Sequence, residues 1–378
     1  MDFELSETQA MVRDTARAYA DRVLSKRAAG FERDERIDPE VLREMASMGL
    51  MGVNLPAALG GAEAGAVSYA LAMMEIAGGC AATAVTMAVT NMVGEVINAF
   101  GTEAQRARYV PRLASGEYLA GSFALSEPEA GSDPGSMRTT ATRAGDRWII
   151  RGAKQWITSG DIAGVMVVWA RTGGAGTAGL SCFLVEGGAE GLRVGRREDK
   201  MGIRGSSTVP LEFDDVSVPA EALLGVEGGG FKIAMMALDG GRIGIGAQAV
   251  GIATAATREA TEYAKDRKQF GQPIANFQAI QWMLADNLTE LEAARLLVLR
   301  AATLKDATRP FSTEAAMAKL FASEAAWRAT SRAVQVHGGY GYTREFPAER
   351  HLRDSRVTMI YEGTSEIQRI VIARSMLR

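Results

Sequence analysis

The sequence predicts a mainly α-helical protein with a smaller β domain at its centre. Residues from Ser6 to about Phe100 are rich in Ala, Met and Leu with few β-branched runs, and this texture returns after residue 231. From about Gly121 to Pro219, short β-branched and aromatic runs alternate with glycine-rich turns. We therefore expect three domains: a helical domain over residues 1–120, a β domain over 121–223 and a second helical domain over 224–378.

The first part contains signals of helices joined by tight turns. Ser6 and Gln9 have the spacing of a capping box, in which each side chain binds a free backbone N–H at a helix start. The residues Asn54-Leu55-Pro56 and Gly60-Gly61 interrupt the helical pattern and predict turns. Residues 76–94 carry no charge, but they are mostly Ala, Gly and Thr with one Asn, so we expect a buried helix and no membrane span.

The middle part contains three runs that predict strands. They are "RWIIRGAKQWIT" (147–158), "VMVVWA" (165–170) and "LSCFLVE" (180–186). Their branched and aromatic side chains favour a pleated surface, and "TGGAGTAG" (172–179) supplies a glycine-rich turn between the last two runs.

The last part returns to a helical pattern and ends on an unexplained acid. An apolar stripe at three- and four-residue steps, interrupted by Arg295, consists of Leu284, Leu288, Leu291, Val298 and Ala302. Near the end, Ser365 and Gln368 have capping-box spacing. The negative charge of Glu366, in the first turn of the same helix, interacts favourably with the positive end of the helix dipole. Glu362, in "YEGTSEIQR" (361–369), is then either an ordinary surface or capping acid or a functional carboxylate.

Composition and charge exclude several classes of protein. A chain of 378 residues with 47% hydrophobic and 23% charged residues has ample material for a core. The net charge of -3 and the lack of a basic run argue against nucleic-acid binding. Cys80 and Cys182 are too few for a disulfide framework, which fits a reducing compartment. The start, "MDFELSETQ", has no apolar run after a basic segment, so we expect no signal peptide and a cytoplasmic location.

The sequence argues against three common kinds of functional site: a dinucleotide-binding loop, a metal site and a Ser-His-Asp triad. "GIGAQA" (244–249) matches a loose dinucleotide-binding pattern, but it lies in a helical stretch, where small residues allow close helix packing. His337 and His351 are the only histidines, neither has metal-site spacing, and we expect structural roles and no metal. The sequence has no G-x-S-x-G motif, and two histidines leave little room for a Ser-His-Asp enzyme.

Five further motifs could each be a turn or helix end when taken singly. They are "ALSEPEAGSD" (124–133), "KQWIT" (154–158), "DRKQFGQPI" (266–274), "QVHGGYGYTREFPAERHLRD" (335–354) and "YEGTSEIQR" (361–369). Together, in this order and across the whole chain, they resemble the acyl-CoA dehydrogenase family, in particular its short-chain, butyryl-like branch. The resemblance implies an N-terminal helical bundle, a small β-barrel-like domain and a C-terminal four-helix bundle.

The resemblance also implies an activity. Members are homotetrameric flavoenzymes that form a trans-2,3 double bond in an acyl-CoA thioester and pass electrons to an electron-transferring flavoprotein. No protein side chain accepts two electrons from an unactivated carbon pair, so a cofactor, FAD in this family, carries that chemistry. The alternatives are an acyl-CoA oxidase or nitroalkane-oxidase relative that uses O₂, and a helical scaffold without flavin. Chain length and Glu362 argue against the oxidases, and the retained motif residues argue against the scaffold.

The residues implied for FAD fall into three groups. At the isoalloxazine, by family position, are Phe123, Ala124, Leu125, Ser126, Trp156 and Thr158, with Ser126 where many members have Thr. Reaching a neighbouring subunit's FAD are Arg267, Phe270, Gln278, Gln335, Gly338 and Gly339. At the start of the last helix are Thr364 and Glu366. An Arg fork suits a pyrophosphate, and glycines let backbone approach it closely.

The residues implied for the substrate and the reaction are fewer. For acyl-CoA binding they are Ser132, Asp239, Arg242 and Gly363. Some members carry the catalytic Glu on the helix around residue 241, where this chain has Gly, so Glu362 is expected to be the base. We expect short acyl chains, with the pocket floor on the helix around residues 86–96, where Met92 or Glu95 could limit the depth.

Overall fold

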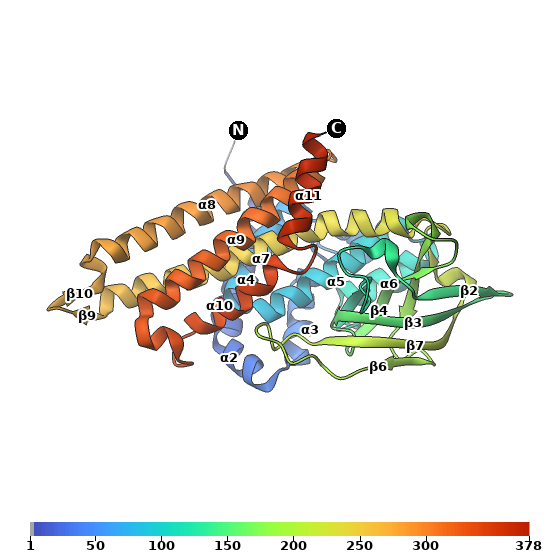
Figure 1. Ribbon diagram of the computed structural model, residues 1–378, viewed down its shortest axis with the longest axis horizontal. Coiled ribbons are helices and arrows are strands. Elements are labelled where there is room, and N and C mark those ends of the chain that lie inside the picture. The colour runs from blue at the N-terminus through green and yellow to red at the C-terminus, as the bar shows by residue number, and fades with distance from the viewer. Residues whose placement is uncertain (1–3, 378) are drawn as a thin grey trace.

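The structure, a computed structural model, describes residues 4–377, so Met1 to Phe3 of the N-terminal stretch and Arg378 lie outside it. Helices come first, then strands, then helices (Figure 1). The first group comprises α1 (Glu7–Tyr19), α2 (Ser25–Asp34), α3 (Pro39–Ser47), α4 (Gly65–Gly79), α5 (Ala81–Phe100) and α6 (Glu103–Ala114), with a π-helical turn between α1 and α2. The predicted capping box at Ser6 is confirmed, because its hydroxyl accepts from Gln9 N and the Gln9 side chain accepts from Ser6 N.

The strands form one mixed sheet. They are β1 (Ala120–Ala124), β2 (Thr140–Ala144), β3 (Arg147–Thr158), β4 (Ala163–Arg171), β5 (Leu180–Glu186), β6 (Leu192–Val194), β7 (Thr208–Pro219) and β8 (Leu223–Leu224). The order is β6-β7-β3-β2-β4-β5-β8, and β1 pairs in parallel with β4. The predicted strands over 147–158, 165–170 and 180–186 are therefore confirmed.

Strand β4 is buried on both faces, which explains its continuous apolar run. Val165, Val167 and Trp169 pack into the core shared with the helices. The alternate residues Met166 and Val168 pack into a second core within the β domain. Because successive side chains of a strand point to opposite faces, such a strand needs apolar residues at every position.

The last group of helices is longer and holds the candidate site. It comprises α7 (Gly230–Asp266), α8 (Gln278–Asp306), α9 (Ser312–His337), α10 (Ala348–Arg356) and α11 (Ser365–Met376), and β9 (Lys268–Gln269) pairs with β10 (Gln272–Pro273) in a short hairpin. Helices α7, α8 and α9 contact one another, and the hairpin lies at the end of the molecule away from the β domain (Figure 1). The "GIGAQA" stretch lies inside α7, where Gly246 packs against Val298, as predicted.

Two predictions about helices need correction. The uncharged stretch 76–94 is buried, but it is two helices, since α4 ends at Gly79 and the extended Cys80 precedes α5. No helix within residues 4–377 is long and apolar enough to cross a membrane. The stripe on α8 is wrong at Leu288, which is 68% exposed, while Asn287 is buried and donates to Ala329 O. The buried face of α8 therefore includes the polar residue Asn287, whose side chain binds a backbone carbonyl of α9.

Candidate active site

Glu362 lies in a short loop before α11, and this loop is held from two helices. Glu362 and Gly363 both have positive φ, 54° and 86°. The Lys319 Nζ on α9 donates to Gly363 O at 2.7 Å. The Gln368 Nε2 on α11 donates to Gly363 O at 2.8 Å and to Glu362 O at 3.2 Å. A left-handed non-glycine residue is strained, and these hydrogen bonds fix the loop in that conformation.

The predicted capping box at Ser365 is wrong by one residue. Thr364 is the N-cap, and its hydroxyl accepts from Ile367 N at 3.3 Å. The Ser365 hydroxyl is buried without a hydrogen-bond partner. Gln368 binds the carbonyls of the Glu362 loop instead of capping the helix, so its role is to hold the loop.

The Glu362 carboxylate is buried and incompletely paired. Its Oε2 is buried and has no hydrogen-bond partner. Burial raises the pKa of Glu362 to about 7, against the opposing effect of Arg242 and Lys319. Burial likewise lowers the pKa of Lys319 to about 7. A carboxyl with a pKa near neutrality is suited to exchange a proton with a bound molecule at physiological pH.

The predicted substrate residues Asp239 and Arg242 bind each other. The Arg242 Nη1 lies 2.5 Å from Asp239 Oδ1, which also accepts from the Ser312 hydroxyl at 2.9 Å. Arg242 is buried, and its Nε has no hydrogen-bond partner. Arg242 lies on the expected helix, α7, and its positive charge lowers the pKa of Glu362 against the effect of burial.

Gly241 on α7 leaves the space that the Glu362 carboxylate occupies. A Cβ at Gly241 would lie 2.6 Å from Glu362 Oε2 and 3.2 Å from the Met92 sulfur. Contacts below about 3 Å between such atoms do not occur in folded proteins, so no larger residue fits here without movement. Residue 241, the alternative position of the catalytic Glu in the family, and Glu362, the expected base, are therefore adjacent in the structure.

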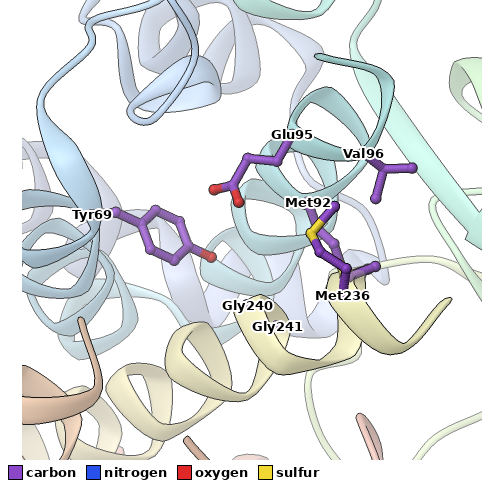
Figure 2. Close-up of a pocket in the computed structure, with 8 residues that line it drawn as sticks. Tyr69, Met92, Glu95, Val96, Met236, Gly240 and Gly241 are labelled. Carbon is purple, nitrogen blue, oxygen red and sulfur yellow. The ribbon is translucent and has the colours of Figure 1, made fainter. Parts of the chain in front are cut away.

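A small cavity adjoins this point (Figure 2). Its volume is about 10 Å³, enough for roughly one water molecule. It is lined by Tyr69, Met92, Glu95, Val96, Met236, Ala237, Gly240 and Gly241. Figure 2 shows the Tyr69 hydroxyl and the Glu95 carboxylate directed toward each other above Gly240 and Gly241. Burial, with the charges of Glu95 and Glu362, raises the pKa of Tyr69, so its hydroxyl stays protonated. Met92 and Glu95, the two residues suggested for the pocket floor, both line the cavity.

The residues predicted for the isoalloxazine come from two adjacent segments. Phe123 and Ala124 end β1, and Leu125 and Ser126 follow it. Trp156 and Thr158 lie at the end of β3. The backbone joins these segments, because Gln155 N donates to Ser126 O at 2.9 Å, and the Ser122 hydroxyl donates to Thr158 O at 2.8 Å.

Trp156 is the exposed member of this group. Its φ is 66°, and 61% of the residue is accessible. The register of β3 against β7 shifts between Lys154 and Ile157, which turns the indole out of the regular strand pattern. A strained, exposed aromatic side chain is an expected feature where a planar ligand binds.

A buried ion pair that the sequence analysis missed holds the two segments together. The Lys154 Nζ binds Glu127 Oε1 at 2.8 Å and Leu125 O at 3.1 Å. Glu127 also accepts from the backbone N–H groups of Arg138 and Thr139. Burial lowers the pKa of Lys154 to about 8, while the Glu127 charge opposes this shift. A lysine in the middle of a strand pattern was the available signal.

The residues predicted to reach a neighbouring FAD lie partly around a second, open pocket. Its volume is about 490 Å³, and its lining residues are Tyr263, Arg267, Gln269, Ile274, Val336, His337, Gly338, Gly339, Tyr340 and Thr343. Arg267, Gly338 and Gly339 are thus brought together. Phe270, Gln278 and Gln335 are exposed but do not line it, and Phe270 is 94% accessible with a φ of 52°.

Other predicted positions are on the surface or structural. Ser132 and Glu366 are exposed. His337 stacks on Tyr263 with ring centroids 4.4 Å apart, and His351 lies 3.2 Å from Glu259, which agrees with structural roles for both histidines. Within the part of the chain that the structure describes, no group of three His, Cys, Asp or Glu side chains could hold a metal.

Comparison with known proteins assigns the family. Acyl-CoA dehydrogenase models match the chain in three parts: the N-terminal domain over residues 6–117, the middle domain over 122–216 and the C-terminal domain over 228–377. The mitochondrial short-chain specific acyl-CoA dehydrogenase of Bos taurus is 49% identical over 99% of this chain and 91% of its own. The acryloyl-CoA reductase (NADH) of Anaerotignum propionicum is 45% identical over 100% of this chain and 96% of its own.

Solved structures agree. Butyryl-CoA dehydrogenase from Megasphaera elsdenii has a TM-score of 0.98 at 43% identity, with both chains covered completely. Glutaryl-CoA dehydrogenase from Mycobacterium smegmatis in complex with FADH2 has a TM-score of 0.94 at 32% identity, covering 98% of this chain and 95% of that one. This chain belongs to the acyl-CoA dehydrogenase family, so it is an oxidoreductase acting on CH–CH groups with FAD as its cofactor. The resemblance and the fold class predicted from the sequence are confirmed.

Proposed function

We propose that this protein dehydrogenates short acyl-CoA thioesters to trans-2-enoyl-CoA, with Glu362 as the base that removes the α-proton. One observation carries the proposal: the Glu362 Oε2 is buried, free of partners and directed at the space that Gly241 leaves beside a small cavity. With a pKa of about 7, much of the carboxyl is ionised at neutral pH and can accept a proton.

The residues present fit FAD. An exposed Trp156 with positive φ beside the Ser126 segment offers a planar contact and polar groups. The second pocket offers the Arg267 guanidinium and two glycines at which a Cβ would meet no atom within 4 Å, so backbone can approach a phosphate. Bound FAD supplies the acceptor for the hydride that leaves the β-carbon. We assign to its ring Phe123, Ala124, Leu125, Ser126 and Thr158. We assign to its adenosine and pyrophosphate Arg267, Phe270, Gln278, Gln335, Gly338 and Gly339.

The protein's own contribution is to hold one proton acceptor and the thioester in place. Lys319 and Gln368 fix the loop, so the Glu362 carboxylate is already in position before the substrate binds. The backbone N–H of Glu362 is assigned to the thioester oxygen, where negative charge develops as the α-proton leaves. Ser132, Asp239 and Gly363 are assigned to the acyl-CoA along with Arg242.

Short chains are proposed because the cavity is small and because several relatives are named for them. Met92, Met236 and Glu95 leave about 10 Å³ beside Gly241. Relatives from Bos taurus and Clostridium acetobutylicum, at 49% and 44% identity, are short-chain specific. One solved structure of this fold, at 44% identity, comes from work on an electron-transferring flavoprotein, which supports such a protein as the electron acceptor here.

Assembly and location belong to the same proposal. Phe270, Trp282 and Leu288 are 94%, 64% and 68% accessible in the single chain. Exposed large apolar groups on a long helix and its adjoining hairpin favour contact with other subunits, which supports a homotetramer. Cys80 and Cys182 are both buried free thiols, which supports a reducing, cytoplasmic compartment.

The test is anaerobic reduction of the purified holoprotein by butyryl-CoA. The yellow flavin colour should bleach on mixing and return when oxidised electron-transferring flavoprotein is added. Bleaching by butyryl-CoA followed by rapid recovery with O₂ alone would indicate the oxidase alternative. No bleaching by any acyl-CoA from propionyl to octanoyl would refute the proposal, and acryloyl-CoA reduction with NADH would indicate the reverse direction.

A further inference from the structure

Glu95 lines the cavity, and behind it the carboxylate forms an ion pair with Lys305, from a distant part of the chain. The Lys305 Nζ, in the last turn of α8, lies 2.5 Å from Glu95 Oε2 on α5. The Asn54 Nδ2 donates to the other carboxylate oxygen at 2.6 Å. The side chains of Lys305 and Glu95 are 22% and 19% accessible. Both oxygens of this carboxylate are therefore occupied by donors, unlike those of Glu362.

The ion pair lies close to the Glu362 carboxylate, because the two face successive residues of α7, Gly240 and Gly241. A Cβ at Gly240 would lie 3.3 Å from Lys305 Nζ and 3.7 Å from Glu95 Oε2, whereas a Cβ at Gly241 would meet Glu362. Consecutive Cα atoms are about 3.8 Å apart, so both carboxylates face the same short section of α7. Figure 2 shows the Glu95 side chain reaching from α5 into the space above these glycines.

The position of Lys305 is fixed by its neighbour. Asp306 caps the start of α4, accepting from Ala66 N at 2.6 Å and from Val67 N at 3.1 Å. Helix α4 in turn carries Tyr69, which lines the same cavity. The cap therefore fixes the backbone of α8 next to Lys305, and the hydrogen bond to Glu95 holds the ammonium at the end of its flexible side chain.

We propose that the Glu95–Lys305 ion pair is the floor of the acyl pocket and selects short acyl chains. This inference rests on the proposed function. A chain that reaches past Gly240 must push apart a paired carboxylate and ammonium that are already partly desolvated, and burial of further methylenes does not offset the separation of such a pair. A short chain ends before the pair and contacts Met92 and Met236.

The experiment replaces both charges by apolar groups of similar size. The double variant Glu95→Leu/Lys305→Met leaves no unpaired charge, in contrast to either single variant. The readout is kcat/KM for butyryl-, hexanoyl- and octanoyl-CoA in the holoenzyme. We expect the octanoyl-to-butyryl ratio to rise roughly tenfold or more. A folded double variant whose ratio changes less than about twofold would overturn the inference.

The matched control removes an exposed ion pair of the β domain. Arg193 on β6 pairs with Asp214 on β7 at 2.7 Å, and both are more than half accessible. The variant Arg193→Met/Asp214→Asn loses two charges without touching the cavity. Its chain-length ratio should equal that of the wild type, and a ratio that moved as much as in the floor variant would overturn the inference.

A second variant tests the pocket floor by making the pocket shallower instead of deeper. Gly240→Ala adds one methyl group 3.3 Å from the flexible end of Lys305 in a helix, where Ala is favoured. It should lower the hexanoyl-to-butyryl ratio and weaken binding of trans-2-hexenoyl-CoA more than that of crotonyl-CoA by calorimetry. Equal effects on both ligands would contradict the inference.

The outcomes separate this inference from the proposed function. If the wild type oxidises butyryl-CoA but the variants keep its chain-length selectivity, the ion pair is not the pocket floor, and the proposed function stands. If the wild type does not oxidise any acyl-CoA, the proposed function itself is refuted.

Discussion

Replacement of Glu362 by Gln should remove the reaction and stabilise the protein. The amide keeps the size and the backbone of the loop, so fold, yellow colour and acyl-CoA binding should be retained. It cannot take the α-proton, and general-base catalysis contributes roughly 10²- to 10⁴-fold, so flavin bleaching should slow by several orders of magnitude. In the wild type, bleaching should rise about tenfold per pH unit up to pH 7 and then level off, because the pKa of Glu362 is about 7.

The stability change follows from the same pKa. The folded pKa of about 7 lies above the ordinary 4.5, so between these values the folded state binds more protons than the unfolded chain, and wild-type stability falls as pH rises. The full shift corresponds to at most about 3 kcal/mol at 1.36 kcal/mol per pKa unit. Since the residue is partly accessible, we expect about 1–2 kcal/mol at pH 8 after allowing for solvent screening.

Two measurements check this reasoning. Stopped-flow bleaching with butyryl-CoA gives the rate, and thermal unfolding of holoprotein at pH 5 and pH 8 gives the stability. We expect Glu362→Gln to raise Tm by a few degrees at pH 8 and by much less at pH 5. Glu212→Gln, at an exposed position of β7, is the control and should change neither quantity. A near wild-type bleaching rate would exclude Glu362 as the base, and an equal Tm gain at both pH values would exclude a buried carboxylate as the cause.

Three further predictions concern other parts of the molecule. Lys319→Met should move the midpoint of the pH profile of kcat/KM upward by about one unit, because Arg242 alone then opposes the burial of Glu362, whereas Lys319→Arg should keep it; an unmoved midpoint would contradict this. Arg267→Ala should lose flavin absorbance and tetramer together in sedimentation experiments, since a ligand shared between subunits stabilises only the assembly; a monomer that retains FAD would refute the link. Asn91→Leu should lower the free energy of unfolding by about 2–3 kcal/mol in a denaturant titration, because it strands the buried Val53 N–H, now 2.9 Å from Asn91 Oδ1; a loss below about 0.5 kcal/mol would show that water replaces the amide.

The strands and the catalytic loop could be predicted from sequence because their signals are local. The run 147–158 has the composition of a strand and is one, β3. Gly363, after an acid and before a helix start, indicated a tight loop, and the loop carries two successive positive φ values. The exact cap was not predictable, because Thr364 and Ser365 are both good N-cap residues and only the loop conformation chooses between them.

The partners of the charged groups could not be predicted, because they are distant in sequence. Glu95 stands out as the single charged residue of α5. Its partner Lys305 is 210 residues away, and nothing near either residue indicates the pairing. Lys319 gave a weak signal, since it lies four residues after Ala315 and three before Ala322, both buried on one helical face. A lysine on a buried face needs a partner, but its acceptor, a carbonyl of the Glu362 loop, depends on how α9 packs against α11.

The two carboxylates of the cavity illustrate how the same side chain acquires different roles. Glu95 has donors on both oxygens, so its charge is satisfied and it can act as a wall. Glu362 has a buried oxygen without a donor, and Lys319 binds the adjacent carbonyl instead of the carboxylate. A direct bond from Lys319 to the carboxylate would lower the pKa of Glu362 and weaken it as a base. By binding Gly363 O, the lysine fixes the loop while leaving the carboxylate basic, which is why Lys319→Met is expected to change the pH profile and the position of the loop together.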